Sequence, residues 1–113
     1  MRYVPYHRLA NLPNVIVDGK ATDSTVLTLS HWPCSDTPVD FKADLSAEIV
    51  YRYLRNPGSA LPANCDVVSN NHFDEDGLVS LYCLLNPHKA LEEESTLVDI
   101  ARAGDFGTFT DRE

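Results

Sequence analysis

The stretch Cys65–Leu85, CDVVSNNHFDEDGLVSLYCLL, passes from a short apolar run through an acidic cluster into a second apolar run. Its first residues, Cys65–Ser69, are typical of a short and partly buried strand. The second run, Leu78–Leu85, repeats its apolar residues at the i, i+3, i+4 and i+7 spacing of an amphipathic helix, and Asn86-Pro87 ends it. A strand that leads directly into a helix is the repeating unit of an α/β sheet, so this stretch predicts the α/β class.

Two further strands are expected before this stretch, over Val15–Val17 and Thr25–Leu29, where β-branched and apolar residues gather. Asp18-Gly19 is a turn signal between them. Because several residues separate the two runs, we expect a hairpin closed by a loop. A helix should follow, with Asp44 as its N-cap and its end at Asn56-Pro57-Gly58.

A last helix is expected over about Lys89–Ala103, with Gly104 as its stop. The resulting pattern, β-β-α-β-α-α, predicts a small three-layer-type sheet with helices. Three strands make a small sheet. We therefore expect residues 1–113 to form a single α/β domain, or an incomplete, N-terminal portion of a larger α/β domain, or a sheet that is completed by association.

Composition narrows the functional classes. The 113 residues carry 17 acidic and 9 basic side chains and a net charge of -8, which disfavours binding to duplex nucleic acid. No apolar run approaches the roughly 20 residues needed to cross a bilayer, and the first residues lack the apolar segment of a signal peptide, so a cytoplasmic location is expected. Three cysteines without a CxxC pair (Cys34, Cys65 and Cys83) argue against a disulfide scaffold and suit a reducing compartment.

The acidic cluster is a candidate metal site. His72, Asp74 and Asp76 alternate, so in an extended segment their side chains would point to one side. They would follow the carboxyl end of a strand, where open α/β sheets place ligands. Such groups repel one another unless a cation compensates them, and carboxylates with one imidazole suit Mn²⁺, Mg²⁺ or Fe²⁺. The alternative is that Asp74 or Asp76 only caps the helix in a solvated loop.

Other calcium- and phosphate-binding motifs do not fit. Aligning Gly77 with the glycine of an EF-hand loop places His72 at the first position and Cys83 at the twelfth, where Asp and Glu are required. A P-loop needs a glycine-rich run that ends in Lys-Ser or Lys-Thr, and the sequence has none.

His31 ends the second expected strand much as His72 follows the third. If these strands are neighbours, His31 adds a metal ligand or a general base; the alternative is a hydrogen-bonded imidazole at a packed edge. The adjacent Trp32 is expected in the core or an interface rather than as a substrate platform. Cys34 as a nucleophile would need a base such as His31 or His72, and no local signature supports that role.

The segment HFDEDGLVSLYCLL resembles the first motif of the DHH phosphoesterase superfamily, the RecJ-like nucleases and related phosphodiesterases. There a strand ends in a His-x-Asp-x-Asp-Gly-x-x-Ser pattern that opens an apolar helix, and His72, Asp74, Asp76, Gly77 and Ser80 match it. The name-giving Asp-His-His triplet does not occur in this chain. The family's other metal ligands lie on later strands, for which Asp105 is the one candidate here.

This resemblance implies that His72, Asp74 and Asp76 bind a divalent metal, usually manganese, that activates water for attack on a phosphorus ester. Two hypotheses result. The first is a divalent-metal-dependent phosphoester hydrolase with Mn²⁺ (or Mg²⁺) at these three residues and His31, acting on a phosphorylated small molecule or nucleotide. The second is a non-catalytic interaction or oligomerisation domain, for example a homo-oligomer, in which the acidic loop only caps a helix.

Overall fold

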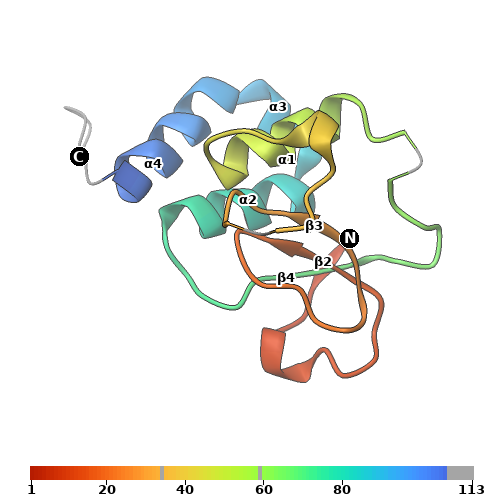
Figure 1. Ribbon diagram of the computed structural model, residues 1–113. Helices are drawn as coiled ribbons and strands as arrows, with labels where there is room; N and C mark the ends of the chain where they lie inside the picture. Colours follow the sequence, from red (N-terminus) through yellow and green to blue (C-terminus); the bar gives the residue numbers. More distant parts are fainter. Residues whose placement is uncertain (34, 59, 107–113) are drawn as a thin grey trace.

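The computed structural model of the protein describes residues 1–33, 35–58 and 60–106 (Figure 1). These residues form a four-stranded sheet and four α-helices, which confirms the predicted α/β class. In chain order the elements are β1 (Arg2–Tyr3), the 3-10 helix η1 (Tyr6–Arg8), β2 (Asn14–Val17), β3 (Thr25–Leu29), the 3-10 helix η2 (Val39–Phe41), α1 (Ser46–Arg55), β4 (Val67–Ser69), α2 (Glu75–Leu85), α3 (Pro87–Glu92) and α4 (Glu94–Phe106).

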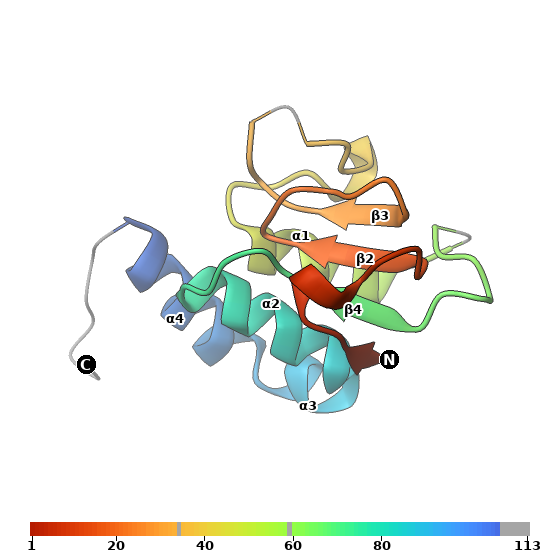
Figure 2. The ribbon, with the colours of Figure 1, turned by 90° about the horizontal axis from the view of Figure 1, so that it is seen from below.

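The sheet has the strand order β1-β4-β2-β3, and every neighbouring pair is parallel. The expected hairpin between β2 and β3 is therefore wrong, and Figure 2 shows their arrowheads pointing the same way. A four-residue strand spans only about 13 Å. Because the strands are so short, the seven residues 18–24 return the chain to the start of β3 without a helical crossover.

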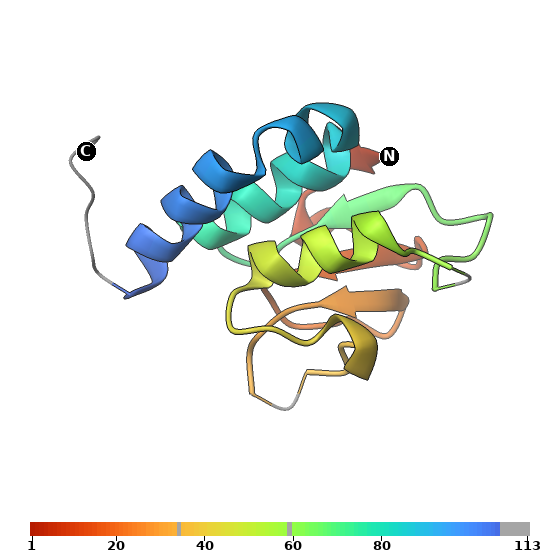
Figure 3. The same ribbon diagram turned by 90° about the horizontal axis from the view of Figure 1, so that it is seen from above.

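The two faces of the sheet are covered differently. Val15 and Val17 point to the face that carries the helices and join the main core there. Ile16 and Val67 point to the opposite face, where they pack against Leu9 beside η1. Figure 1 shows all four helices on one side of the sheet and η1 on the other, and Figure 3 shows the helices in front of the strands when the protein is seen from the helix side.

The first long helix, α1, begins without a cap from its own segment. Its N-cap residue is Leu45, whose side chain cannot accept a hydrogen bond, so the prediction of Asp44 as N-cap is wrong. The first backbone N–H groups of α1, those of Ser46 and Ala47, donate instead to the carboxylate of Asp76, at 2.9 and 2.8 Å. The cap comes from a residue 30 positions away in the chain, which local sequence patterns do not reveal.

The last expected helix is divided into α3 and α4 at Glu93, and Gly104 lies inside α4 rather than at its end. Gly104 is needed there for packing against α2. A Cβ at this position would lie 2.5 Å from Oε2 and 2.6 Å from Cβ of Glu75. In the described residues no helix is long and apolar enough to cross a bilayer.

Gly104→Ala is therefore expected to destabilise the fold. The clash with Glu75 should lower the free energy of unfolding by about 1–3 kcal/mol, which outweighs the gain of at most about 1 kcal/mol from the helix propensity of alanine. Urea unfolding measures the change. Thr96→Ala, at an exposed position of the same helix, is the control and should be neutral or stabilising. A Gly104→Ala variant as stable as the parent would contradict the close packing of α2 and α4.

Candidate metal centre

Three loops converge at the edge of the sheet where β2, β3 and β4 end. Asp18 follows β2, His31 follows β3, and His72 follows β4. Asn70 ties two of these loops together, because its side-chain amide donates hydrogen bonds to the carbonyls of Val17 (2.5 Å) and Asp18 (3.0 Å). The ends of three parallel strands therefore present their polar side chains to one point.

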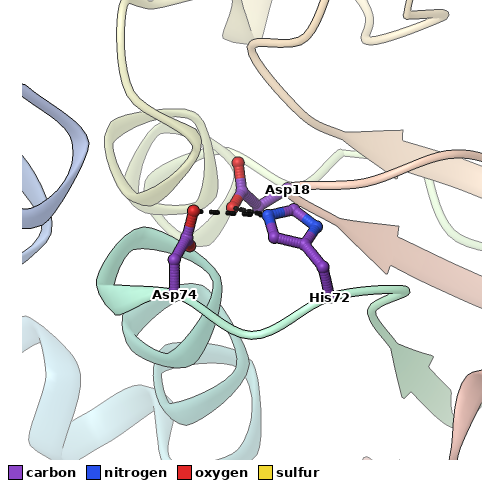
Figure 4. Close-up of side chains that lie close together, drawn as sticks. All are labelled: Asp18, His72 and Asp74. Carbon is purple, nitrogen blue, oxygen red and sulfur yellow. Dashed lines mark hydrogen bonds and ion pairs between the residues drawn. The ribbon is translucent and has the colours of Figure 1, made fainter.

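The first cluster consists of Asp18, His72 and Asp74 (Figure 4). Nε2 of His72 lies 3.3 Å from Oδ2 of Asp18 and 3.3 Å from Oδ2 of Asp74. Figure 4 shows the three side chains pointing toward one another from the end of β2 and from the loop before α2. One imidazole nitrogen and two carboxylate oxygens thus face a common centre.

The second cluster consists of Asp18, His31 and Asp76. Nε2 of His31 lies 3.3 Å from Oδ1 of Asp18 and 3.6 Å from Oδ2 of Asp76. In both clusters the candidate ligand atoms lie within 4.8 Å of one another. Asp18 belongs to both clusters and turns one carboxylate oxygen toward each histidine.

Asp18 is the most constrained residue of the site. Its side chain is 1% exposed, and its Oδ1 accepts hydrogen bonds from Oγ of Ser46 (2.8 Å) and Nε1 of Trp32 (3.2 Å). Its buried Oδ2 accepts no hydrogen bond from any residue that the structure describes. Burial, together with the neighbouring carboxylates of Asp76 and Asp74, raises the pKa of Asp18 to about 7, although the Ser46 hydroxyl acts in the opposite direction.

Asp74 has a capping role as well as a place in the first cluster. Its Oδ1 accepts a hydrogen bond of 2.8 Å from the backbone N–H of Gly77 and caps α2. Burial acts to raise the pKa of Asp74, but the Gly77 N–H, Asp18 and His72 together outweigh it, and the pKa lies below its ordinary value. Asp74 therefore stays ionised beside an Asp18 that retains its proton to higher pH.

His72 is oriented mainly by packing. The indole of Trp32 lies against it, with ring centroids 4.8 Å apart, and its backbone N–H donates to Oδ1 of Asn70. Its Nδ1 is buried and has no hydrogen-bond partner among the described residues. Trp32 was expected in the core or an interface; it is half-buried and lies beside Asp18 and His72, outside the main core.

The structure brings together all four residues that the sequence singled out, but not as one alternating set. His72 and Asp74 share a cluster, whereas Asp76 pairs with His31. The reason is that α2 begins at Glu75, so Asp76 lies on a helix and its side chain turns away from the direction of the two preceding ligands.

The strand that leads to His31 is not the neighbour of β4, which was the condition set for His31 to join the site, because β2 lies between them. That intervening strand supplies Asp18, which the sequence analysis interpreted only as a turn residue. The available signal was an aspartate directly after a buried β-branched run, the same position that drew attention to His72. Cys34 and the side chain of Asp105 lie outside the described residues.

Each cluster offers donors of a kind that divalent ions accept. Carboxylate oxygens and a neutral imidazole suit hard and borderline ions, and the buried Oδ2 of Asp18, which accepts no hydrogen bond from the described residues, lies 3.3 Å from Nε2 of His72 in the first cluster. Three carboxylates and two histidines in one partly buried place carry an excess of negative charge. A cation bound there would offset both the cost of burying the Asp18 carboxylate and its repulsion from Asp76 and Asp74, which together raise the pKa of Asp18.

Comparison with curated proteins and with solved structures gave no match. Comparison with known protein families matched residues 1–113 to DUF6687, which is described as a family of unknown function. Because the match covers the whole sequence, the chain belongs to the DUF6687 family.

Proposed function

We propose that this protein is a divalent-metal-dependent phosphoester hydrolase whose centre consists of the two clusters joined by Asp18. The observation that supports the proposal most strongly is the position of Asp18, whose two oxygens face His31 and His72 at 3.3 Å each. One carboxylate between two imidazole–carboxylate pairs is an arrangement suited to two neighbouring ions. Mn²⁺ or Mg²⁺ fits the donor set.

The contacts of these residues indicate which of them would hold each ion. Asp18, His72 and Asp74 would hold one ion, and Asp18, His31 and Asp76 the other. Ser46 and Trp32 fix the shared carboxylate through their hydrogen bonds to its Oδ1. Divalent ions bound in such sites lower the pKa of a coordinated water and stabilise the charge that develops on a phosphoryl group.

The resemblance of the His72–Ser80 segment to the DHH phosphoesterases supports the same reaction class. Asp18 and His31 extend the set of candidate ligands beyond that one motif. A cytoplasmic location agrees with the free thiols of the buried residues Cys65 and Cys83.

The single tryptophan of the chain, Trp32, provides a direct test. Because its indole contacts both Asp18 and His72, titration with Mn²⁺ should quench its fluorescence through the paramagnetic ion and raise the melting temperature. The metal-loaded protein should hydrolyse p-nitrophenyl phosphate or bis-p-nitrophenyl phosphate, and EDTA should stop the reaction. A chain whose fluorescence and melting temperature do not respond to millimolar Mn²⁺ or Mg²⁺ would not be a metal-dependent hydrolase.

The second candidate function, association through a protein interface, is favoured by one observation. Tyr3 and Phe73 pack against each other with ring centroids 6.4 Å apart, yet they are 37% and 60% exposed. Exposed aromatic side chains beside the edge strand β1 suit a contact with another protein. A stable oligomer in sedimentation analysis, without any response to metal, would favour this function over hydrolysis.

A further inference from the structure

A pocket of about 350 Å³ adjoins the metal centre. Its walls come from the segment after β2, from β3 and from the segment after β3, and they include Gly19, Lys20, Thr28, Trp32 and Ser35. Leu27 and Leu29 face the helices, so Thr28 between them points to the opposite face of the sheet. The pocket therefore reaches from the metal centre toward the face of the sheet that carries no α-helix, and its size suits a small organic group.

Trp32 is the side chain that the pocket and the metal centre share. It lines the pocket, donates a hydrogen bond to Oδ1 of Asp18 and lies against the ring of His72. These contacts fix the plane of the indole, because Asp18 and His72 are themselves held in place by hydrogen bonds from Ser46 and to Asn70. A phosphoryl group at the metal centre would thus place the remainder of its ester beside a rigid aromatic wall.

Lys20 supplies a positive charge to this pocket. The backbone on both sides of its side chain is anchored: its N–H donates to Oδ1 of Asn71 at 2.9 Å, and its carbonyl accepts from the hydroxyl of Tyr6 at 3.0 Å. Within the described residues no ion pair joins Lys20 to a carboxylate, although Asp36 also lines the pocket. This is notable in a chain with 17 acidic and 9 basic residues.

The close approach of the Asn71 side chain to Gly19 and Lys20 fixes the start of the segment that follows β2. A Cβ at Gly19 would lie far closer to the Asn71 amide oxygen than van der Waals contact allows, so glycine is what lets that oxygen reach the N–H of Lys20. Asn71 is the neighbour of His72 in the chain. The position of Lys20 is consequently tied to the same loop that carries the first cluster.

We propose that this pocket is the leaving-group subsite of the hydrolase and that it selects small phosphoesters whose organic part carries a second anionic group. The organic part lies against Trp32, beside the lining residues Thr28 and Ser35, and the second anionic group pairs with Lys20. This assignment rests on the proposed function. The second group is a carboxylate or a phosphate, since Lys20 as a point charge accepts either one.

Two pairs of ligands test the proposal on the Mn²⁺-loaded chain by isothermal titration calorimetry. 3-Phosphoglycerate and glycerol 3-phosphate differ only by a carboxylate, and fructose 1,6-bisphosphate and fructose 6-phosphate differ by a second phosphate. The parent should bind the first member of at least one pair about tenfold more tightly. Lys20→Ala should abolish that preference and leave the affinity for the second member unchanged, while Lys20→Arg should retain most of it.

Lys89→Ala is the matched control, because Lys89 is exposed on α3, which packs against α2 and α4, and its loss changes the net charge equally. It should keep the parent's preference. Equal weakening by Lys20→Ala and Lys89→Ala, or no preference in the parent, would overturn the subsite. Electron paramagnetic resonance of Mn²⁺ separates the two proposals: a parent that binds no Mn²⁺ overturns both, whereas Mn²⁺ binding without a ligand preference overturns the subsite alone.

Discussion

Asp18→Asn is expected to abolish the Mn²⁺-dependent rise in melting temperature. The variant removes the one carboxylate that both clusters share, and an amide donates only a weak, neutral oxygen to a divalent ion. In the parent, Mn²⁺ at 100 times its dissociation constant should stabilise the fold by about 2.7 kcal/mol. For a domain of about 100 residues that corresponds to a rise of roughly 10 °C or more. In the variant, phosphoesterase activity should fall to the background of the buffer.

The same variant should be more stable than the parent at pH 7 once metal has been chelated. Because burial raises the pKa of Asp18 from 3.8 to about 7, the folded parent binds one more proton than the unfolded chain between those values. Its stability should therefore decrease as the pH rises from about 4 to 7, by an amount of the order of 4 kcal/mol. Asp74, whose pKa is lowered, affects stability only below about pH 4 and leaves this window unchanged.

Asp66→Asn is the control for both measurements. Asp66 is exposed, pairs with Arg2 at 3.6 Å and lies outside both clusters, so this variant should keep the metal response and the pH dependence of the parent. Thermal unfolding from pH 4 to pH 8, with EDTA or with Mn²⁺, compares the three proteins. A metal-dependent rise that persists in Asp18→Asn would show that Asp18 is not a shared ligand.

Asp76→Ala is expected to be the most destabilising change at the site. The Asp76 side chain is fully buried, and its two oxygens accept the backbone N–H groups of Ser46 and Ala47 at the start of α1. Each such charge-assisted hydrogen bond contributes about 1.5–3 kcal/mol. Their joint loss should lower the melting temperature by more than about 10 °C in the absence of metal.

Asp74→Ala is the matched comparison, because it also removes a carboxylate from one cluster and a cap from one helix. Asp74 is 41% exposed and accepts a single N–H, so the cost should be about 1 kcal/mol. Unlike Asp76→Ala, this variant retains the second cluster and should still bind one Mn²⁺ per chain in equilibrium dialysis. If Asp74→Ala were as destabilising as Asp76→Ala, the cap of α1 would not depend on Asp76.

Local patterns predicted much of this fold. The β-branched runs, the apolar periodicity of α2 and the proline after it were sufficient to find three of the strands, two of the helices and the α/β class. The pairing of β2 with β3 was wrong because hairpin rules consider loop length alone, whereas short parallel strands also allow a seven-residue return. Leu78 belongs to the predicted apolar stripe but is 52% exposed, because α2 packs mainly against α1 and α4 and its buried residues do not form a single stripe.

The site, like the fold, was predictable only where its residues lie close together in the sequence. His72, Asp74 and Asp76 were recognisable because they lie within five residues of one another. Asp18 and His31 join them through the strand order, which places β2 between β3 and β4 and cannot be read from spacing along the chain. The alternative roles of the acidic residues were not exclusive either: Asp74 and Asp76 both cap helices and both belong to the clusters.

The hydrogen bonds from Asn70 to Val17 and Asp18 join positions that are 53 and 52 residues apart. A chain segment that ends before β4 contains Asp18 and His31 but neither His72 nor Asp74, so during synthesis no complete cluster exists until the second half has paired with β2. Parallel pairing at such separation is a slow step in folding. If the clusters hold the proposed metal, its capture would come last in the maturation of the protein, after the two halves of the sheet have joined.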